Sequence, residues 1–295
     1  MLAQINYCLS LIPQQNTLIM KNLLLLVFAF MNLATAIAQT TTIDRNFFDR
    51  TEAFLKNNVR HGLVDYRGLT AAAELSGLIQ TVQTAKIDNL NAPTRQAFLI
   101  NAYNLLVIKG AADAYPLNSV RSVNGFFDSK KRTVAGKSVT LNQLEKEWLL
   151  KRYDDPRFHF VLVCGAVGCP PITNFAYRPA QLEQQLATQT RKALNDSSFI
   201  RINAEQNKVE LSQIFEWYAG DFGGSKKAAI KFINQYRSAK IPAGYRVTFY
   251  SYDWNLNGQN AGNSTNGLRP DALDNNAANA NRYVVSSTIP RGGVE

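Results

Sequence analysis

The central stretch of this 295-residue chain reads FHFVLVCGAVGCPP from Phe158 to Pro171. Its first half, up to Cys164, is a continuous apolar run interrupted only by His159. Its second half is rich in glycine and proline, the residues that favour turns. A short apolar run bounded by turn residues is typical of a strand buried in the core. We therefore predict a strand over 158–164, followed by a loop over 165–171.

Helical and extended patterns alternate on both sides of this stretch. Upstream, the patterns predict helices over 44–58, 70–84 and 94–114, a turn into a short strand over 61–66, a hairpin over 134–139 and a helix from 140 to 152 that opens with a Thr140–Gln143 capping box. Downstream, they predict helices over 179–195, 212–218 and 226–236 and strands over 199–203, 209–211 and 246–252. This alternation predicts an α/β or α+β fold, a single domain with a central mixed or antiparallel sheet flanked by helices.

The helix expected over 94–114 is apolar nearly all round, so it should lie in the core. It carries Asn101 and Asn104, which are three residues apart and therefore share one side of the helix. Buried amides need hydrogen-bond partners. We expect these two side chains to organise a polar spot inside the core, either lining a binding pocket or bonding neighbouring backbone.

The N-terminus has the pattern of an export signal. Lys21 is followed by an apolar run over 23–31 and then by Ala36-Ile37-Ala38, the small-x-small pattern of a signal peptidase site. A membrane-spanning helix, the alternative, would need about 18 or more apolar residues. We predict a signal peptide over 1–38 with Met20 as the true start, export to the periplasm or the outside of the cell, and no membrane span in the mature chain.

Composition describes a globular protein with a core, since 46% of its residues are hydrophobic and 18% charged. We expect one globular domain over 39–257 and an Asn-, Gly- and Ala-rich tail over 258–295. The net charge of +10 comes from scattered lysines and arginines, which indicates a solvated basic surface and no nucleic-acid site. The expected partner is a peptide or an envelope polymer.

Several separated segments resemble the family called domain of unknown function 547. They are 97–104 (AFLINAYN), 141–145 (LNQLE), 157–170 (RFHFVLVCGAVGCP), 216–222 (EWYAGDF) and 252–257 (YDWNLN). The resemblance covers 64–257 and implies a single domain. It implies no substrate, because the family is named for having no established activity.

The residues themselves point to a thiol nucleophile at Cys169, with His159 as its base and Glu145 or an asparagine as the orienting group. Pro170 follows Cys169, and proline is favoured at the first helical position, so we predict that Cys169 caps a short helix. There the helix dipole would lower the pKa of the thiol. The roles are similar to those in papain-like and transglutaminase-like enzymes, in the permuted order with histidine before cysteine.

Two other interpretations of the same residues stay open. A Cys164–Cys169 disulfide would close a small loop, and Cys164, Cys169 and His159 together would give three ligands for a metal. Two functions therefore stay open. A reactive Cys169 predicts a thiol-dependent hydrolase or acyltransferase acting on peptide or amide bonds. The disulfide predicts a non-catalytic binding or scaffold module. No cofactor motif is present.

The remaining candidates are polar and aromatic side chains that would line a pocket or support the core. Asp221 and Asp253 are expected either in the pocket or as caps, and Trp217 and Trp254 either as core aromatics or as the floor of a cleft. His61 is expected to be an exposed turn residue.

Overall fold

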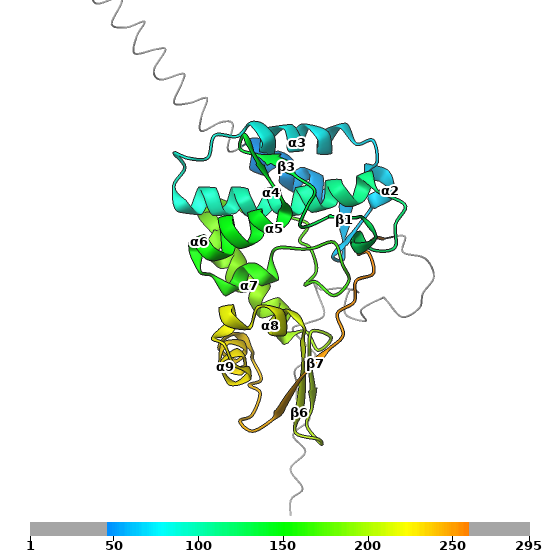
Figure 1. Ribbon diagram of the computed structural model, residues 1–295. Coiled ribbons are helices and arrows are strands. Elements are labelled where there is room, and N and C mark those ends of the chain that lie inside the picture. The colour runs from blue at the N-terminus through cyan, green and yellow to red at the C-terminus, as the bar shows by residue number, and fades with distance from the viewer. Residues whose placement is uncertain (1–45, 260–295) are drawn as a thin grey trace, which may run out of the picture. The chain divides into compact units, whose positions relative to one another are not determined.

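The structure, a computed structural model, describes residues 46–259 (Figure 1). The predicted signal peptide, the start at Met20 and nearly all of the predicted tail lie outside these residues. Residues 46–58 are helical, and the chain divides into two units after Asp49. The second unit begins at Arg50 and contains every described element that follows. Among the described residues, no helix has both the length and the apolar character needed to cross a bilayer.

Helix α4, Ala92–Asp113, lies in the core, as its apolar sequence predicts. Asn91 caps its N-terminus by accepting a hydrogen bond from the Thr94 N–H. Helix α3, Ala73–Thr84, packs along it, and its buried face is the predicted one: Leu75, Leu78, Ile79 and Val82. Further helices are α2 Tyr66–Leu69, η1 Val120–Ser122, η4 Pro179–Gln181, α7 Leu182–Asn195 and η5 Ala219–Phe222.

The strands form three small sheets. Strands β1 (Val59–Arg60) and β2 (Leu63–Val64) pair through a turn at His61 and Gly62, and β3 (Arg132–Val134) and β4 (Lys137–Val139) form the predicted hairpin. The third sheet has the order β5 (Ile200–Asn203), β6 (Lys208–Ser212), β7 (Arg246–Tyr250). Strands β5 and β6 are antiparallel and β6 and β7 parallel, joined by a crossover that carries α8 (Ile214–Trp217) and α9 (Lys226–Tyr236). The mixed sheet lies away from α3 in Figure 1, and the α+β prediction is confirmed.

A helix begins at Leu141, where both bonds of the predicted capping box between Thr140 and Gln143 are present. It continues through α5 (Leu141–Gln143), a π-helical stretch η2 (Leu144–Leu150) and α6 (Lys151–Tyr153). Wide π turns are uncommon inside α-helices and are often found at functional sites. This one contains Glu145.

The predicted strand over 158–164 is wrong. Residues Pro156–Phe160 form a 3-10 helix, η3, and the chain then continues as a loop. Asp155 caps η3 by accepting a hydrogen bond from Arg157 N–H, and Pro156 favours a helical start. The apolar run is buried, as predicted. Its backbone N–H and C=O groups, however, hydrogen-bond to side chains, where the prediction expected a neighbouring strand.

Asn104 takes the place of that sheet partner. Its Nδ2 donates to the Val161 carbonyl, and its Oδ1 accepts from the Val163 N–H, both at 2.9 Å. One amide thus bonds the two backbone groups that a neighbouring strand would have bonded. It fixes the segment leading to Cys164 against α4.

Asn101, one turn earlier on α4, does the same for another segment. Its Nδ2 donates to the Tyr177 carbonyl at 2.8 Å, and its Oδ1 accepts from the Tyr177 N–H at 3.0 Å. Asn101 and Asn104 are both buried. The two asparagines were expected either to line a binding pocket or to bond neighbouring backbone, and the structure shows the second.

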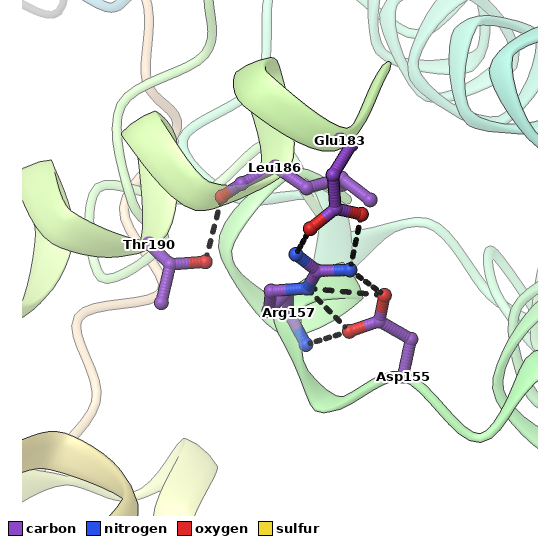
Figure 2. A network of polar contacts seen from close by, with 5 residues as sticks. All are labelled: Asp155, Arg157, Glu183, Leu186 and Thr190. Atoms are coloured by element: carbon purple, nitrogen blue, oxygen red, sulfur yellow. Dashed lines mark hydrogen bonds and ion pairs between the residues drawn. The ribbon is translucent and has the colours of Figure 1, made fainter. Parts of the chain in front are cut away.

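Arg157 fastens η3 to α7 (Figure 2). Its guanidinium donates to both carboxylate oxygens of Asp155, and it also pairs with both oxygens of Glu183 in the first turn of α7. The hydrogen bond that Arg157 donates lowers the pKa of the Glu183 carboxyl. This ion-pair network holds the short helix that carries His159.

Phenylalanines fill the core between η3, the mixed sheet and α9. The ring of Phe160 lies 6.1–6.2 Å, between centroids, from those of Phe199, Phe215, Phe222 and Phe232. Contacts at this separation are favourable in tilted and offset geometries. The apolar face of η3 therefore packs against the turn before β5 and against α8, η5 and α9, all of which lie later in the chain.

Replacing Asn104 with alanine should destabilise the fold, because the Val161 carbonyl and the Val163 N–H would lose their partners inside the core. We expect the free energy of unfolding to fall by about 1–3 kcal/mol for each unpaired group, measured by urea denaturation. Asn174→Ala, at an exposed asparagine, is the matched control and should leave stability nearly unchanged. Equal stability of the two variants would contradict the structural role of Asn104.

Candidate functional site

Cys164 and Cys169, the two cysteines within residues 46–259, lie at the ends of a loop that is held by the last described segment of the chain. The Val167 N–H donates to the Asn255 carbonyl and the Gly168 N–H to the Asp253 carbonyl, both at 2.8 Å. The Asn257 N–H donates to the Gly165 carbonyl at 3.1 Å. These bonds bring residues 252–257 alongside the cysteine loop.

Gly168 permits this close approach. A Cβ placed on it would lie 3.0 Å from the backbone N and O of Asp253 and 3.0 Å from Cδ1 of Tyr252. Gly165 has a positive φ of 77°, a conformation that glycine adopts without strain. Each glycine of the loop is therefore required by the backbone: Gly168 by the close approach of residues 252–253, and Gly165 by its positive φ.

Tyr252 lies between the two sulfurs. Its hydroxyl is 2.9 Å from Cys169 Sγ and 3.1 Å from Cys164 Sγ. The Cys164 backbone N–H also donates to Cys169 Sγ at 3.1 Å. Gln213 positions the tyrosine by accepting a hydrogen bond from the Tyr252 N–H at 2.9 Å. Within the described residues both cysteines are thiols, with no disulfide between them.

The two thiols differ in exposure and in pKa. Cys169 is 4% exposed and Cys164 is half-buried. Burial raises the pKa of Cys169, but hydrogen bonds from Cys164, Tyr252 and the surrounding backbone lower it more, to about 7. The hydrogen bond with Cys169, and then burial, raise the pKa of Cys164. The pair therefore loses its first proton near neutral pH and holds its second tightly.

The predicted helix after Cys169 is wrong. Residues 169–173 are irregular, so neither a helix N-terminus nor its dipole faces the sulfur. Side-chain and backbone donors lower the thiol pKa in place of the expected dipole. The double proline 170–171 instead packs on the β1–β2 turn, where a Cβ on Gly62 would be 2.4 Å from Cβ of Pro171.

Glu145, expected to orient His159, is instead held by two phenols. Tyr103 donates to one carboxylate oxygen at 2.8 Å and Tyr218 to the other at 2.7 Å. Burial first, and then the charge of Glu145, raise the pKa of both tyrosines. The charge of Cys164 contributes to both shifts as well, so the carboxylate and its phenols lie close to the sulfur pair.

His159 is oriented by Asp221. Its Nε2 is 2.7 Å from Asp221 Oδ2, and its ring lies 4.2 Å from that of Tyr218 and 5.3 Å from that of Phe222. The imidazole is buried, whereas Asp221 is exposed. Because Nε2 contacts the carboxylate, Nδ1 is the nitrogen left for other partners. Asp221, predicted as a pocket residue, thus holds the position expected for Glu145.

The other predicted residues lie around this centre. Asp253 accepts a hydrogen bond from the Asn255 N–H at 2.9 Å, a turn cap. Trp217 is 46% exposed, so its prediction as a core residue is wrong: its ring stacks on Trp254 and tilts against Tyr252, which leaves an outer face in solvent. Trp254 is half-buried, and the Arg121 guanidinium lies over its ring. His61 is exposed in its turn, as predicted.

The tyrosines are the site residues that the sequence analysis did not identify. Tyr252 contacts both thiols, Tyr103 and Tyr218 donate to Glu145, and the hydroxyl of a fourth, Tyr66, donates to Asn257 Oδ1 at 2.7 Å. The first three stand inside segments that carry the family resemblance, and this was the signal that could have found them. Between residues 46 and 259, no three His, Cys, Asp or Glu side chains gather as a metal site, so the three-ligand interpretation of Cys164, Cys169 and His159 fails.

Comparison with known proteins agrees with the resemblance seen in the sequence. The model of the family described as "Protein of unknown function, DUF547" matches residues 87–193, which include the 97–104, 141–145 and 157–170 segments. No curated protein and no solved structure matches the chain. The matched residues, 87–193, include Cys164, Cys169, Glu145 and His159.

Proposed function

We propose that the protein is a thiol-dependent hydrolase or acyltransferase acting on peptide or amide bonds, with Cys169 as its nucleophile. One observation carries the proposal: the buried Cys169 sulfur accepts hydrogen bonds from the Tyr252 hydroxyl at 2.9 Å and the Cys164 N–H at 3.1 Å, donors that lower the pKa of the thiol to about 7. A thiolate is the reactive form of cysteine, and this one forms near neutral pH. Catalytic cysteines are typically found where such donors outweigh burial.

In the proposed reaction, Cys169 Sγ attacks the carbonyl carbon of the substrate and the amine leaves from the tetrahedral intermediate. The resulting thioester passes its acyl group to water in hydrolysis, or to another nucleophile in transfer. Tyr252 first stabilises the thiolate by donating to it from 2.9 Å. In this proposal, as negative charge moves from the sulfur to the carbonyl oxygen of the substrate, the Tyr252 hydroxyl donates a hydrogen bond to that oxygen.

The departing amine needs a proton, and His159 is our candidate for its donor. Asp221 holds the imidazole through Nε2 at 2.7 Å, which leaves Nδ1 for proton transfer. Glu145 has a different role in this proposal. It fixes Tyr103 and Tyr218 beside Cys164, so that the wall of the site cannot shift when the sulfur becomes charged.

We place this activity outside the cytoplasm, on a peptide or an envelope polymer. The support is the N-terminal sequence, in which Lys21, the apolar run over 23–31 and Ala36-Ile37-Ala38 follow the order of a cleavable signal. N-terminal sequencing of the exported protein would test it, with Gln39 expected as the first residue.

The alternative remains a binding module stabilised by a permanent Cys164–Cys169 disulfide. A thiol count on the native protein, with and without denaturant, separates the two. Two free thiols from the pair favour the enzyme, and a pair that stays oxidised in mild reductant favours the module.

Alkylation of Cys169 by iodoacetamide should follow a titration with its midpoint near pH 7, because the thiolate fraction rises with pH through the pKa. Tyr252→Phe keeps the ring and removes the hydroxyl. Since a hydrogen bond to a charged group is worth about 1.5–3 kcal/mol, the midpoint should rise by about 1 pH unit or more. Mass spectrometry of the Cys169 peptide measures both.

Tyr236→Phe is the matched control, because it removes a hydroxyl from α9 near the Arg157 network. The pH midpoint of Cys169 alkylation in Tyr236→Phe should equal that of the natural protein. An unchanged midpoint in Tyr252→Phe would show that the phenol does not stabilise the thiolate.

Incubation with p-nitrophenyl acetate should place one acetyl group on Cys169, located by peptide mapping. Cys169→Ser should lower the rate of acetylation by more than about 100-fold, because a serine hydroxyl stays protonated where the thiol ionises. Cys164→Ser tests which sulfur reacts, since it should still carry the acetyl group on Cys169. Acetylation of other residues only, at equal rates in all three proteins, would contradict the assignment.

Gly168→Ala should raise the midpoint of Cys169 alkylation toward that of Tyr252→Phe. Its Cβ would meet the Asp253 backbone at 3.0 Å and push Tyr252 away from the sulfurs. Gly220→Ala is the control, because a Cβ there meets no atom within 4 Å. A normal titration in Gly168→Ala would mean that the loop contact is not needed to place the phenol.

A further inference from the structure

The two sulfurs of the site are unequally placed along one short loop. Cys164 is half-buried, whereas Cys169 is 4% exposed at its base. Gly165 and Gly168 let the loop fold back, so that the Cys164 N–H reaches Cys169 Sγ at 3.1 Å. In thiol–disulfide exchange an accessible sulfur meets the external partner and a second sulfur displaces it. The exposures of the two sulfurs fit these roles: Cys164 would react with the external partner, and Cys169 would displace it.

The sulfurs also lie close enough to react with each other. Both contact the same Tyr252 oxygen, at 2.9 and 3.1 Å, and a hydrogen bond joins the two thiols. The loop is anchored beside each sulfur, by Asn104, which accepts from the Val163 N–H just before Cys164, and by the Gly168 N–H, which donates to the Asp253 carbonyl just before Cys169. Bond formation therefore calls for side-chain movement within a loop that is already folded back.

We infer that Cys164 and Cys169 form a reversible redox site whose co-reactant is a low-molecular-weight disulfide. Cys164 passes its proton to Cys169 through their hydrogen bond, and its thiolate attacks one sulfur of the external disulfide. A mixed disulfide forms and the first external thiolate leaves. Cys169 then loses its proton to solvent and attacks Cys164 Sγ, and the second external thiolate leaves. The pair gives up two electrons and its single proton, and the external disulfide becomes two thiolates, which take up protons from solvent according to their own pKa.

The bond changes what the site can do. It removes the Cys169 thiolate and with it the charged acceptor of the Tyr252 hydroxyl. Oxidation therefore switches acyl transfer off and reduction restores it. This consequence rests on the proposed function, whereas formation of the bond does not.

The test is to incubate the full chain with oxidised glutathione, quench with acid and map the cysteine peptides by mass spectrometry. The natural protein should gain a Cys164–Cys169 bond and keep no glutathione, and dithiothreitol should reverse the change. Cys169→Ser should stop with one glutathione on Cys164. Cys164→Ser should react at least about tenfold more slowly than Cys169→Ser, because its remaining sulfur is buried. The sequence has a third cysteine, Cys8, and peptide mapping distinguishes its modification from that of Cys164 and Cys169.

Other outcomes overturn the inference. They are a pair that stays unmodified until denaturant is added, glutathione retained without a bridge, or equal rates in the two serine variants. The same samples are assayed for acetyl transfer from p-nitrophenyl acetate. A bridge in a protein that never accepts acetyl would sink the proposed function alone, and acetyl transfer by a pair that never bridges would sink this inference alone.

Discussion

The site depends on the contact between the Tyr252 hydroxyl and the two cysteine sulfurs. A buried thiol normally resists ionisation, because a charge in the interior has lost its water. Here the phenol at 2.9 Å, the neighbouring thiol and the Cys164 N–H replace that water for Cys169 and lower its pKa to about 7. The chemistry proposed for the protein follows from these donors.

Much of the fold serves to bring Tyr252 and the cysteine loop together. Asn104 holds the chain before Cys164 against the buried helix α4, and Arg157 fastens the η3 helix to α7. The last described segment, 252–257, then lies along the loop because Gly168 carries no side chain. Residues far apart in sequence are thus joined by backbone hydrogen bonds, which place the Tyr252 hydroxyl beside the sulfurs.

The sequence predicted most elements, because their signals are local. The capping box at Thr140 and the apolar α4 are examples. The run 158–164 was assigned to a strand because periodicity reports burial and cannot show that an asparagine amide replaces a sheet partner. For the site, the sequence named Cys169, His159 and Asp221 as candidates, but the contacts of Glu145 and Tyr252 join segments 42 and 83 residues apart. No pattern in a single sequence specifies such pairings.

The most direct measurement is the ultraviolet absorbance of the Cys169 thiolate against pH, taken as the difference between the natural protein and Cys169→Ser. The account predicts a transition centred near pH 7. A transition at the ordinary thiol value of about 8.5 or higher would show that the donors do not outweigh burial, and the proposed nucleophile would be lost.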